Sequence, residues 1–114
     1  TCSKHFWTVF RLDIRGSSTE VLLVGVHLKA VPNAPRPCAQ REAQARVLSE
    51  IVREHGHASF REIIIAGDFN DFDSTNLDIS GSMPASSVLQ HLTEDLGLVA
   101  VSDYLAVADR YTWE

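Results

Sequence analysis

The sequence predicts an α/β fold from three observations. Residues 21–28 form an apolar run typical of a buried strand, and residues 38–57 carry apolar side chains at helical spacing. Residues 62–67 then place three consecutive isoleucines before a glycine, which is typical of a second strand. Strand, helix and strand in this order favour a parallel strand pair joined by a helical crossover. The 114 residues fit one domain, and 45% hydrophobic residues exclude a disordered chain.

A hairpin is expected before the helix. Residues 5–14 alternate in part, with Phe6, Thr8, Phe10, Leu12 and Ile14 on one side. Residues 15–18 have turn chemistry, and the run 21–28 barely alternates, which predicts a strand buried on both faces. Residues 30–37 contain three prolines and are expected to form a loop.

The helix is expected over residues 38–57, with Gly56 as the left-handed residue that ends it. Its apolar stripe is expected to contain Ala43, Val47, Leu48, Ile51 and Val52, and its polar face Arg41, Glu42, Arg46, Glu50, Arg53 and Glu54. Beyond the strand at 62–67 we expect an acidic loop over 68–83, a helix over 84–96 and short strands at 98–101 and 110–113.

Charge is distributed unevenly along the chain. Residues 1–61 carry nine basic and five acidic side chains, whereas residues 62–109 carry nine acidic side chains and no Lys or Arg. Self-repulsion in such an acidic segment is relieved by a divalent cation or by solvent. The segment contains Asp71, Asp73, Asn76 and Asp78, a composition similar to that of a cation-binding loop. It has no glycine or glutamate at the positions that an EF-hand requires, which favours a solvated loop.

The two cysteines, Cys2 and Cys38, are too few for a disulfide scaffold, and both free thiols and a single bridge stay open. No apolar run approaches the roughly 20 residues that a membrane helix needs. The start lacks the features of a signal peptide, yet a secreted and a cytoplasmic location both stay open, as does the oligomeric state.

The residues 67–71, Gly-Asp-Phe-Asn-Asp, are the strongest candidate for chemistry. They follow a buried strand, and the carboxyl ends of strands in α/β sheets are where sites form. Strand alternation would place Asp68 and Asn70 on one face. The Asp can accept a proton or hold a metal-bound water, and the Asn can donate to a phosphoryl oxygen. Ordinary turn chemistry is the alternative explanation of this Asp-x-Asn pattern.

His27 is the second candidate because it ends the first apolar strand, where it could contact a phosphate or titrate near neutrality. A histidine at the edge of the core is the structural alternative. If the two strands are neighbours in one sheet, His27 and Asp68 should converge at the same edge.

These segments together resemble the endonuclease/exonuclease/phosphatase superfamily. The resemblance rests on His-Leu-Lys-Ala at 27–30, Arg-Glu-Ala-Gln-Ala at 41–45, Gly-Asp-Phe-Asn at 67–70 and Arg-Tyr-Thr-Trp at 110–113. It implies a four-layer α/β sandwich, with two central sheets flanked by helices, that hydrolyses phosphoesters with Mg²⁺ or Mn²⁺ as Lewis acid. The substrate class among nucleic acids, nucleotides, lipids and inositol phosphates stays open.

The resemblance also implies roles for individual residues. Asp68 would orient or deprotonate the attacking water and, in some members, hold metal; Asn70 would bind the scissile phosphate. His27 would contact the phosphate or act in catalysis, and Arg41 and Gln44 would support the site from behind.

The family domain has further parts that find no match in these residues. An early Asn, a metal-binding Glu and a late Asp-His pair have no equivalent, and Ser102-Asp103-Tyr104 carries Tyr where the family has His. Residues 1–114 therefore resemble the central part of such a domain, which on its own is expected to be inactive or nearly so. A phosphate-binding module that kept the fold without catalysis and a purely structural domain are the alternatives.

Overall fold

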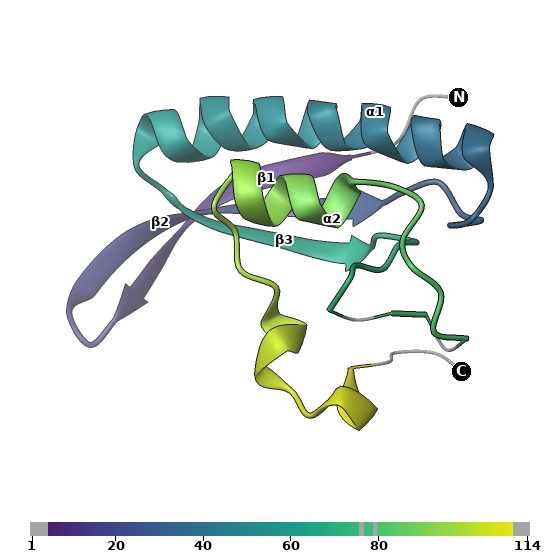
Figure 1. Ribbon diagram of the computed structural model, residues 1–114. Coiled ribbons are helices and arrows are strands. Elements are labelled where there is room, and N and C mark those ends of the chain that lie inside the picture. The colour runs from purple at the N-terminus through teal and green to yellow at the C-terminus, as the bar shows by residue number, and fades with distance from the viewer. Residues whose placement is uncertain (1–4, 76, 79, 111–114) are drawn as a thin grey trace.

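A computed structural model describes residues 5–75, 77, 78 and 80–110 of the chain. In that part, three strands form one sheet in the order β1-β2-β3, with β1 at Phe6–Ile14, β2 at Ser17–His27 and β3 at Glu62–Asp68. Helix α1 (Pro35–Ile51) and the short α2 (Val88–Gln90) lie together over one face of the sheet (Figure 1). The α/β class predicted from the sequence is confirmed, whereas only one of the two expected sheets is seen.

The predicted hairpin is confirmed as an antiparallel pair of β1 and β2 that runs from Phe6–Gly25 to Ile14–Ser17. Its two-residue turn, Arg15 and Gly16, has positive φ at both positions, 49° and 80°. Two consecutive positive φ values define the type I′ turn, whose twist suits a two-residue hairpin.

The predicted crossover is also confirmed, because β2 pairs in parallel with β3 from Val21–Glu62 to His27–Asp68 and α1 connects them. The helix begins three residues earlier than predicted, at Pro35. Prolines are tolerated there because the first-turn N–H groups of a helix have no intrahelical acceptor. Two of the three prolines therefore belong to the helix rather than to the loop.

The core lies between the sheet and the two helical segments. Side chains on one face of β2 pack against α1 and the region of α2; the buried apolar set is Leu22, Val24, Val26, Leu28, Ala45, Leu48, Val52, Val88, Leu92 and Leu96. The predicted stripe of α1 is partly wrong, since Ala43 and Val47 are exposed. Arg41, which we placed on the polar face, is buried instead.

The predicted end of the helix at Gly56 is corrected as well. A single π-helical turn (Val52–Gly56) and a 3₁₀ turn (His57–Ser59) follow α1, and the left-handed residue is Phe60 with φ of 53°. Gly56 has φ of −100° and is buried. A Cβ at this glycine would lie 2.7 Å from Cδ1 of Ile63, so its small size allows the helix end to approach β3.

The chain after β3 is less regular than predicted. The second helix begins at Val88 rather than residue 84 and continues as a π-helical turn (His91–Asp95). The strand expected at 98–101 is absent, and short 3₁₀ turns occupy Val101–Tyr104 and Val107–Asp109. Of the strand expected at 110–113, residues 111–113 lie outside the described residues.

Within residues 5–75 and 80–110, no layer of helices covers the other face of the sheet. Alternation directs the side chains of β1 that face away from α1 toward this open face, where Phe6 is 72% and Ile14 is 55% exposed. The prediction that β2 is buried on both faces is therefore only partly confirmed, since Val21 on the open face is buried whereas Leu23 and Gly25 are half-buried. Within the described residues, no helix has the length and apolar character to cross a membrane.

Candidate functional site

His27 and Asp68 are opposite one another at the last position of the parallel ladder between β2 and β3. Neighbouring strands lie about 4.8 Å apart, and paired residues point to the same face. Both residues are exposed and lie on the open face of the sheet. The fold thus brings together two residues that are 41 positions apart in sequence, at the carboxyl edge of the sheet.

Asn70 joins this edge through backbone geometry rather than through strand alternation. Its φ of 49° is left-handed, so the extended conformation ends before it. Its N–H donates to Oδ1 of Asp68 at 2.9 Å, and its side-chain Nδ2 donates to the carbonyl of Leu28 at 3.0 Å. Asn70 therefore ties the ends of β2 and β3 together while fixing one oxygen of the Asp68 carboxylate.

Gly67 is required at the position before Asp68. Its φ is 140°, a conformation that residues with side chains rarely adopt, and a Cβ here would overlap the carbonyl oxygen of Val26. The two strands consequently approach more closely than any larger residue would permit. The glycine places Asp68 close to β2.

Arg41 supports the loops behind the site. Its side chain is 0% exposed and donates to the carbonyl oxygens of Lys29 at 3.0 Å, Val31 at 3.2 Å and Pro32 at 2.7 Å. These three carbonyls belong to the loop that follows His27. The loop therefore surrounds the guanidinium with three carbonyl acceptors. Within this loop Val31 adopts a left-handed φ of 69°.

Asp71 provides the counter-charge to this guanidinium. Its buried carboxylate accepts from Nε of Arg41 at 3.1 Å, from the backbone N–H of Phe72 at 3.0 Å and from the hydroxyl of Ser86. The ion pair thus connects the loop after β2 with the loop after β3. A buried charge pair of this kind depends on complete hydrogen bonding, which the three carbonyls and these donors supply.

Gln44 lies one turn further along α1 and holds the same loop. Its Oε1 accepts from the backbone N–H of Lys29 at 2.9 Å. Cys38 contributes from the first turn of the helix, since its free thiol donates to the carbonyl of Pro32 at 2.9 Å. Cys38 thus forms no disulfide in the structure, and Cys2 lies outside the described residues.

A divalent cation would find one carboxylate among the three site residues. Asp68 is exposed, and its Oδ2 has no partner among the described residues, so this oxygen fits a hard cation. No group of three or more His, Cys, Asp or Glu that could hold a metal occurs in the described part of the chain. Mg²⁺ at Asp68 would accordingly retain several waters or take ligands from elsewhere.

Two other polar regions lie apart from this site. The carboxylate of Asp78 accepts from the N–H of Ser82 and the hydroxyl of Ser80, which organises the acidic loop internally. A cavity of about 270 Å³ between α1 and the region of α2 is lined by residues of both, including His91 and Asp95. His91 contacts Ser49 of α1 at 2.5 Å, which fastens the two helical segments together, and it also contacts Asp95 within its own segment.

The chain matches no protein-family model, no curated protein and no solved structure.

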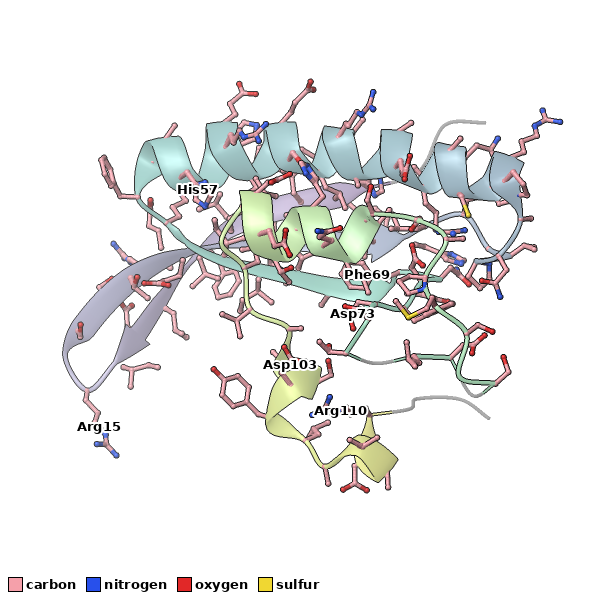
Figure 2. All side chains as sticks on the ribbon, viewed as in Figure 1. Arg15, His57, Phe69, Asp73, Asp103 and Arg110 are labelled. Carbon is pink, nitrogen blue, oxygen red and sulfur yellow. The ribbon has the colours of Figure 1, made fainter. Side chains whose placement is uncertain are left out.

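Sequence reasoning missed Asp71 as the partner of Arg41. A signal for burial of Arg41 was present, because Arg41, Ala45, Leu48 and Val52 are spaced by four, three and four residues along one helix face. The identity of the partner depends on how the loop after β3 folds back toward α1, and no short-range pattern encodes that return. In Figure 2, Phe69 points from this loop into the region beneath α2.

Proposed function

We propose that this chain carries part of the active site of a metal-dependent phosphoester hydrolase of the endonuclease/exonuclease/phosphatase type. The observation that carries the proposal is the pairing of His27 with Asp68 at the carboxyl edge, with Asn70 tied to both strands. Three side chains with acid–base and hydrogen-bonding capacity thus share one exposed edge. Attack of water on a phosphoryl group requires such groups side by side.

The geometry gives each residue a role. Asn70 fixes Oδ1 of Asp68 through its backbone N–H, which leaves Oδ2 to orient or deprotonate water. Nδ2 of Asn70 has a second hydrogen besides the one given to Leu28, and that hydrogen can be donated to a phosphoryl oxygen. His27, across from Asp68, can donate to another oxygen of the same group. A Mg²⁺ or Mn²⁺ ion, when bound, supplies charge stabilisation and polarises the phosphoryl group.

The open face of the sheet supports a larger sandwich. His27 and Asp68 lie on this face, at the rim of an apolar surface that includes Phe6, Ile14 and the 48% exposed Ile64. Sheets that pack face to face cover such surfaces at about 10 Å separation. A second sheet packed here would complete the four-layer arrangement and bring further ligands beside Asp68.

The acidic character of the chain favours one group of substrates. Net charge is −5, and the 62–109 segment lacks Lys and Arg entirely. Binding to long nucleic acids depends on basic side chains that neutralise phosphates. We therefore favour a small or lipid-like phosphoester, with nucleic acid as the alternative.

Binding of phosphate at the edge tests the proposal on this chain directly. The ¹⁵N-labelled chain is titrated with inorganic phosphate, with and without MgCl₂, while its amide resonances are followed. We expect the largest shifts at residues 27–29 and 68–71, with Mg²⁺ enhancing them. Shifts confined to the cavity between the helices, or none at all, would contradict the site.

A matched pair of variants separates a specific site from general charge effects. Asp68→Asn keeps an oxygen that accepts from Asn70 while removing the carboxylate charge, whereas Asp73→Asn removes the same charge at a half-buried position of the acidic loop. The Mg²⁺ enhancement should disappear in the first variant and persist in the second. Phosphate binding without any turnover in the natural protein would instead favour the non-catalytic module.

A further inference from the structure

The outer edge of β1 has no strand beside it in the described part of the chain. Among the elements that the structure describes, β1 is the first of three strands, and only β2 runs alongside it. β3 pairs with β2 only from Val21 onward, so the turn end of the hairpin projects beyond the rest of the sheet (Figure 1). Nine residues of exposed edge with apolar side chains form a template for pairing with another chain.

The turn determines which backbone groups of β1 face outward. A type I′ turn at Arg15–Gly16 closes on a hydrogen-bonded pair, Ile14 with Ser17. Hydrogen-bonded and non-hydrogen-bonded pairs alternate along an antiparallel ladder. The N–H and C=O groups of Val9, Arg11 and Asp13 therefore point away from β2, toward the free edge.

We propose that β1 pairs in antiparallel orientation with β1 of a second copy, about a two-fold axis at Leu12. This register places Arg11 opposite the partner's Asp13, and the symmetry repeats the ion pair on the other side. Both side chains are exposed, at 71% and 67%, and share one face of the strand. Within one copy the two side chains form a loose surface pair at 3.8 Å. Glu20, the residue opposite Arg11 in the hairpin, is paired with Arg61, so Arg11 and Asp13 are available to a neighbour across the outer edge.

Neighbouring registers are less favourable for a simple electrostatic reason. An axis at Arg11 places this residue opposite the partner's Arg11, and an axis at Asp13 places two carboxylates opposite one another. Like charges directly opposite destabilise a strand pair. An axis at Phe10 places Arg11 and Asp13 opposite uncharged residues of the partner. Only the axis at Leu12 satisfies both charged side chains.

The same register also matches apolar side chains on the open face. Leu12, 40% exposed, meets the partner's Leu12, and Phe10 meets the partner's Ile14. These are non-hydrogen-bonded pairs, in which side chains approach most closely. Among the described elements only β2 contacts β1, so the outer edge is accessible; Figure 2 shows Arg15 at its turn end with the side chain pointing away from the rest of the molecule. The pairing extends the sheet and leaves the edge with His27 and Asp68 open, so it is independent of the proposed function.

Cross-linking at the two-fold axis tests the register. Leu12→Cys is made in a Cys2→Ser background and oxidised at low protein concentration. In the proposed register the two copies of residue 12 lie within reach of a disulfide. The control is Thr8→Cys, on the same strand and the same face, whose two copies lie far apart in this register. We expect a covalent dimer for the first variant only; equal cross-linking of both, or of neither, would overturn the register.

A charge exchange tests the ion pairs. The mass of the wild-type chain, measured by light scattering, should rise with concentration from 12.6 kDa toward twice that value. Arg11→Asp should weaken the dimer at least about tenfold, because it places carboxylates opposite each other. The combined Arg11→Asp and Asp13→Arg variant should restore dimerisation. Circular dichroism checks that every variant keeps its fold.

Arg53→Asp, the same charge change at an exposed site on the π-helical turn, is the matched control and should leave the dimer unchanged. A wild-type chain that stays at 12.6 kDa at every concentration would show that no second copy occupies the edge. A dimer that tolerates Arg11→Asp would show that the copies meet through another surface.

Discussion

The carboxylate of Asp68 lies at the end of β3 directly across the ladder from His27 at the end of β2. This relationship follows from the crossover through α1, which sets the two strands parallel and in register. The close approach of the two strands depends on Gly67. The hydrogen bonds of Asn70 to Asp68 and to the carbonyl of Leu28 hold the ends of the strands together. The candidate site is therefore a consequence of sheet topology together with two specialised residues.

Gly67→Ala should destabilise the chain strongly. The added Cβ overlaps the carbonyl oxygen of Val26 and forces a residue with a side chain into φ of 140°. We expect a loss of about 3 kcal/mol or more in unfolding free energy, measured by urea denaturation. Gly16→Ala is the control, since nothing lies within 4 Å of its Cβ and only the strain of positive φ remains, about 1 kcal/mol.

Removing either partner of the buried ion pair should be costly. Arg41→Met removes the cation that pairs with the buried Asp71 carboxylate and the donor to three carbonyls, and we expect a loss of about 3–5 kcal/mol in unfolding free energy. Glu20→Gln, which weakens the exposed pair with Arg61, should change it by less than about 1 kcal/mol. Similar losses for the two variants would mean that the Arg41 cluster does not hold the loops.

The sequence was sufficient to predict the hairpin, the crossover and the strand over 62–67, which the structure extends by one residue to Asp68. Alternation, turn residues and the 3.6-residue period are local signals, and those elements follow local rules. The sequence did not predict which face of α1 is buried, because an arginine such as Arg41 is expected to face solvent unless its hydrogen-bond acceptors are known. Those acceptors are carbonyls of a loop and a carboxylate 30 residues away, whose positions depend on tertiary packing.

The region beyond β3 was predicted least well for a related reason. Residues 98–101 have strand composition, yet no strand of the described sheet accepts them as a neighbour. At the candidate site, alternation predicted that Asp68 and Asn70 lie on one face, and the structure does bring the two residues together. The structure achieves this through a left-handed Asn70 and a hydrogen bond, not through a continuous strand.

His5 should make stability depend on pH. Desolvation lowers the pKa of His5, and both ring nitrogens are buried without a partner among the described residues. The folded chain then disfavours the charged imidazole, so this contribution to stability is complete above the ordinary pKa, about 6.5. It is lost as pH falls through the range between that value and the lowered one.

Urea denaturation between pH 7 and pH 5 measures this effect. His5→Phe should remove the part of the decline that belongs to His5, while His57→Phe, at an exposed position, should leave the decline as it is in the wild type. An unchanged decline in His5→Phe would assign the pH dependence to other groups.

Asn70→Ala should disturb the edge without unfolding the protein. It removes the donor to Leu28 and places a less tolerant residue at φ of 49°, so we expect a loss of about 1–3 kcal/mol in unfolding free energy. Asn70→Gly restores the backbone freedom but not the donor. Stability should therefore recover in part, while phosphate-induced amide shifts at residues 27 and 68 should stay reduced in both variants.

Turnover by the natural protein that contains this chain tests the central claim most directly. Mg²⁺-dependent hydrolysis of a nitrophenyl phosphodiester and a nitrophenyl phosphomonoester is compared for the wild type, Asp68→Asn and Asp73→Asn. The account predicts that Asp68→Asn lowers kcat by about a hundredfold or more, with its unfolding transition preserved, while Asp73→Asn retains activity. Near-normal turnover in a folded Asp68→Asn variant would contradict the assignment of the site.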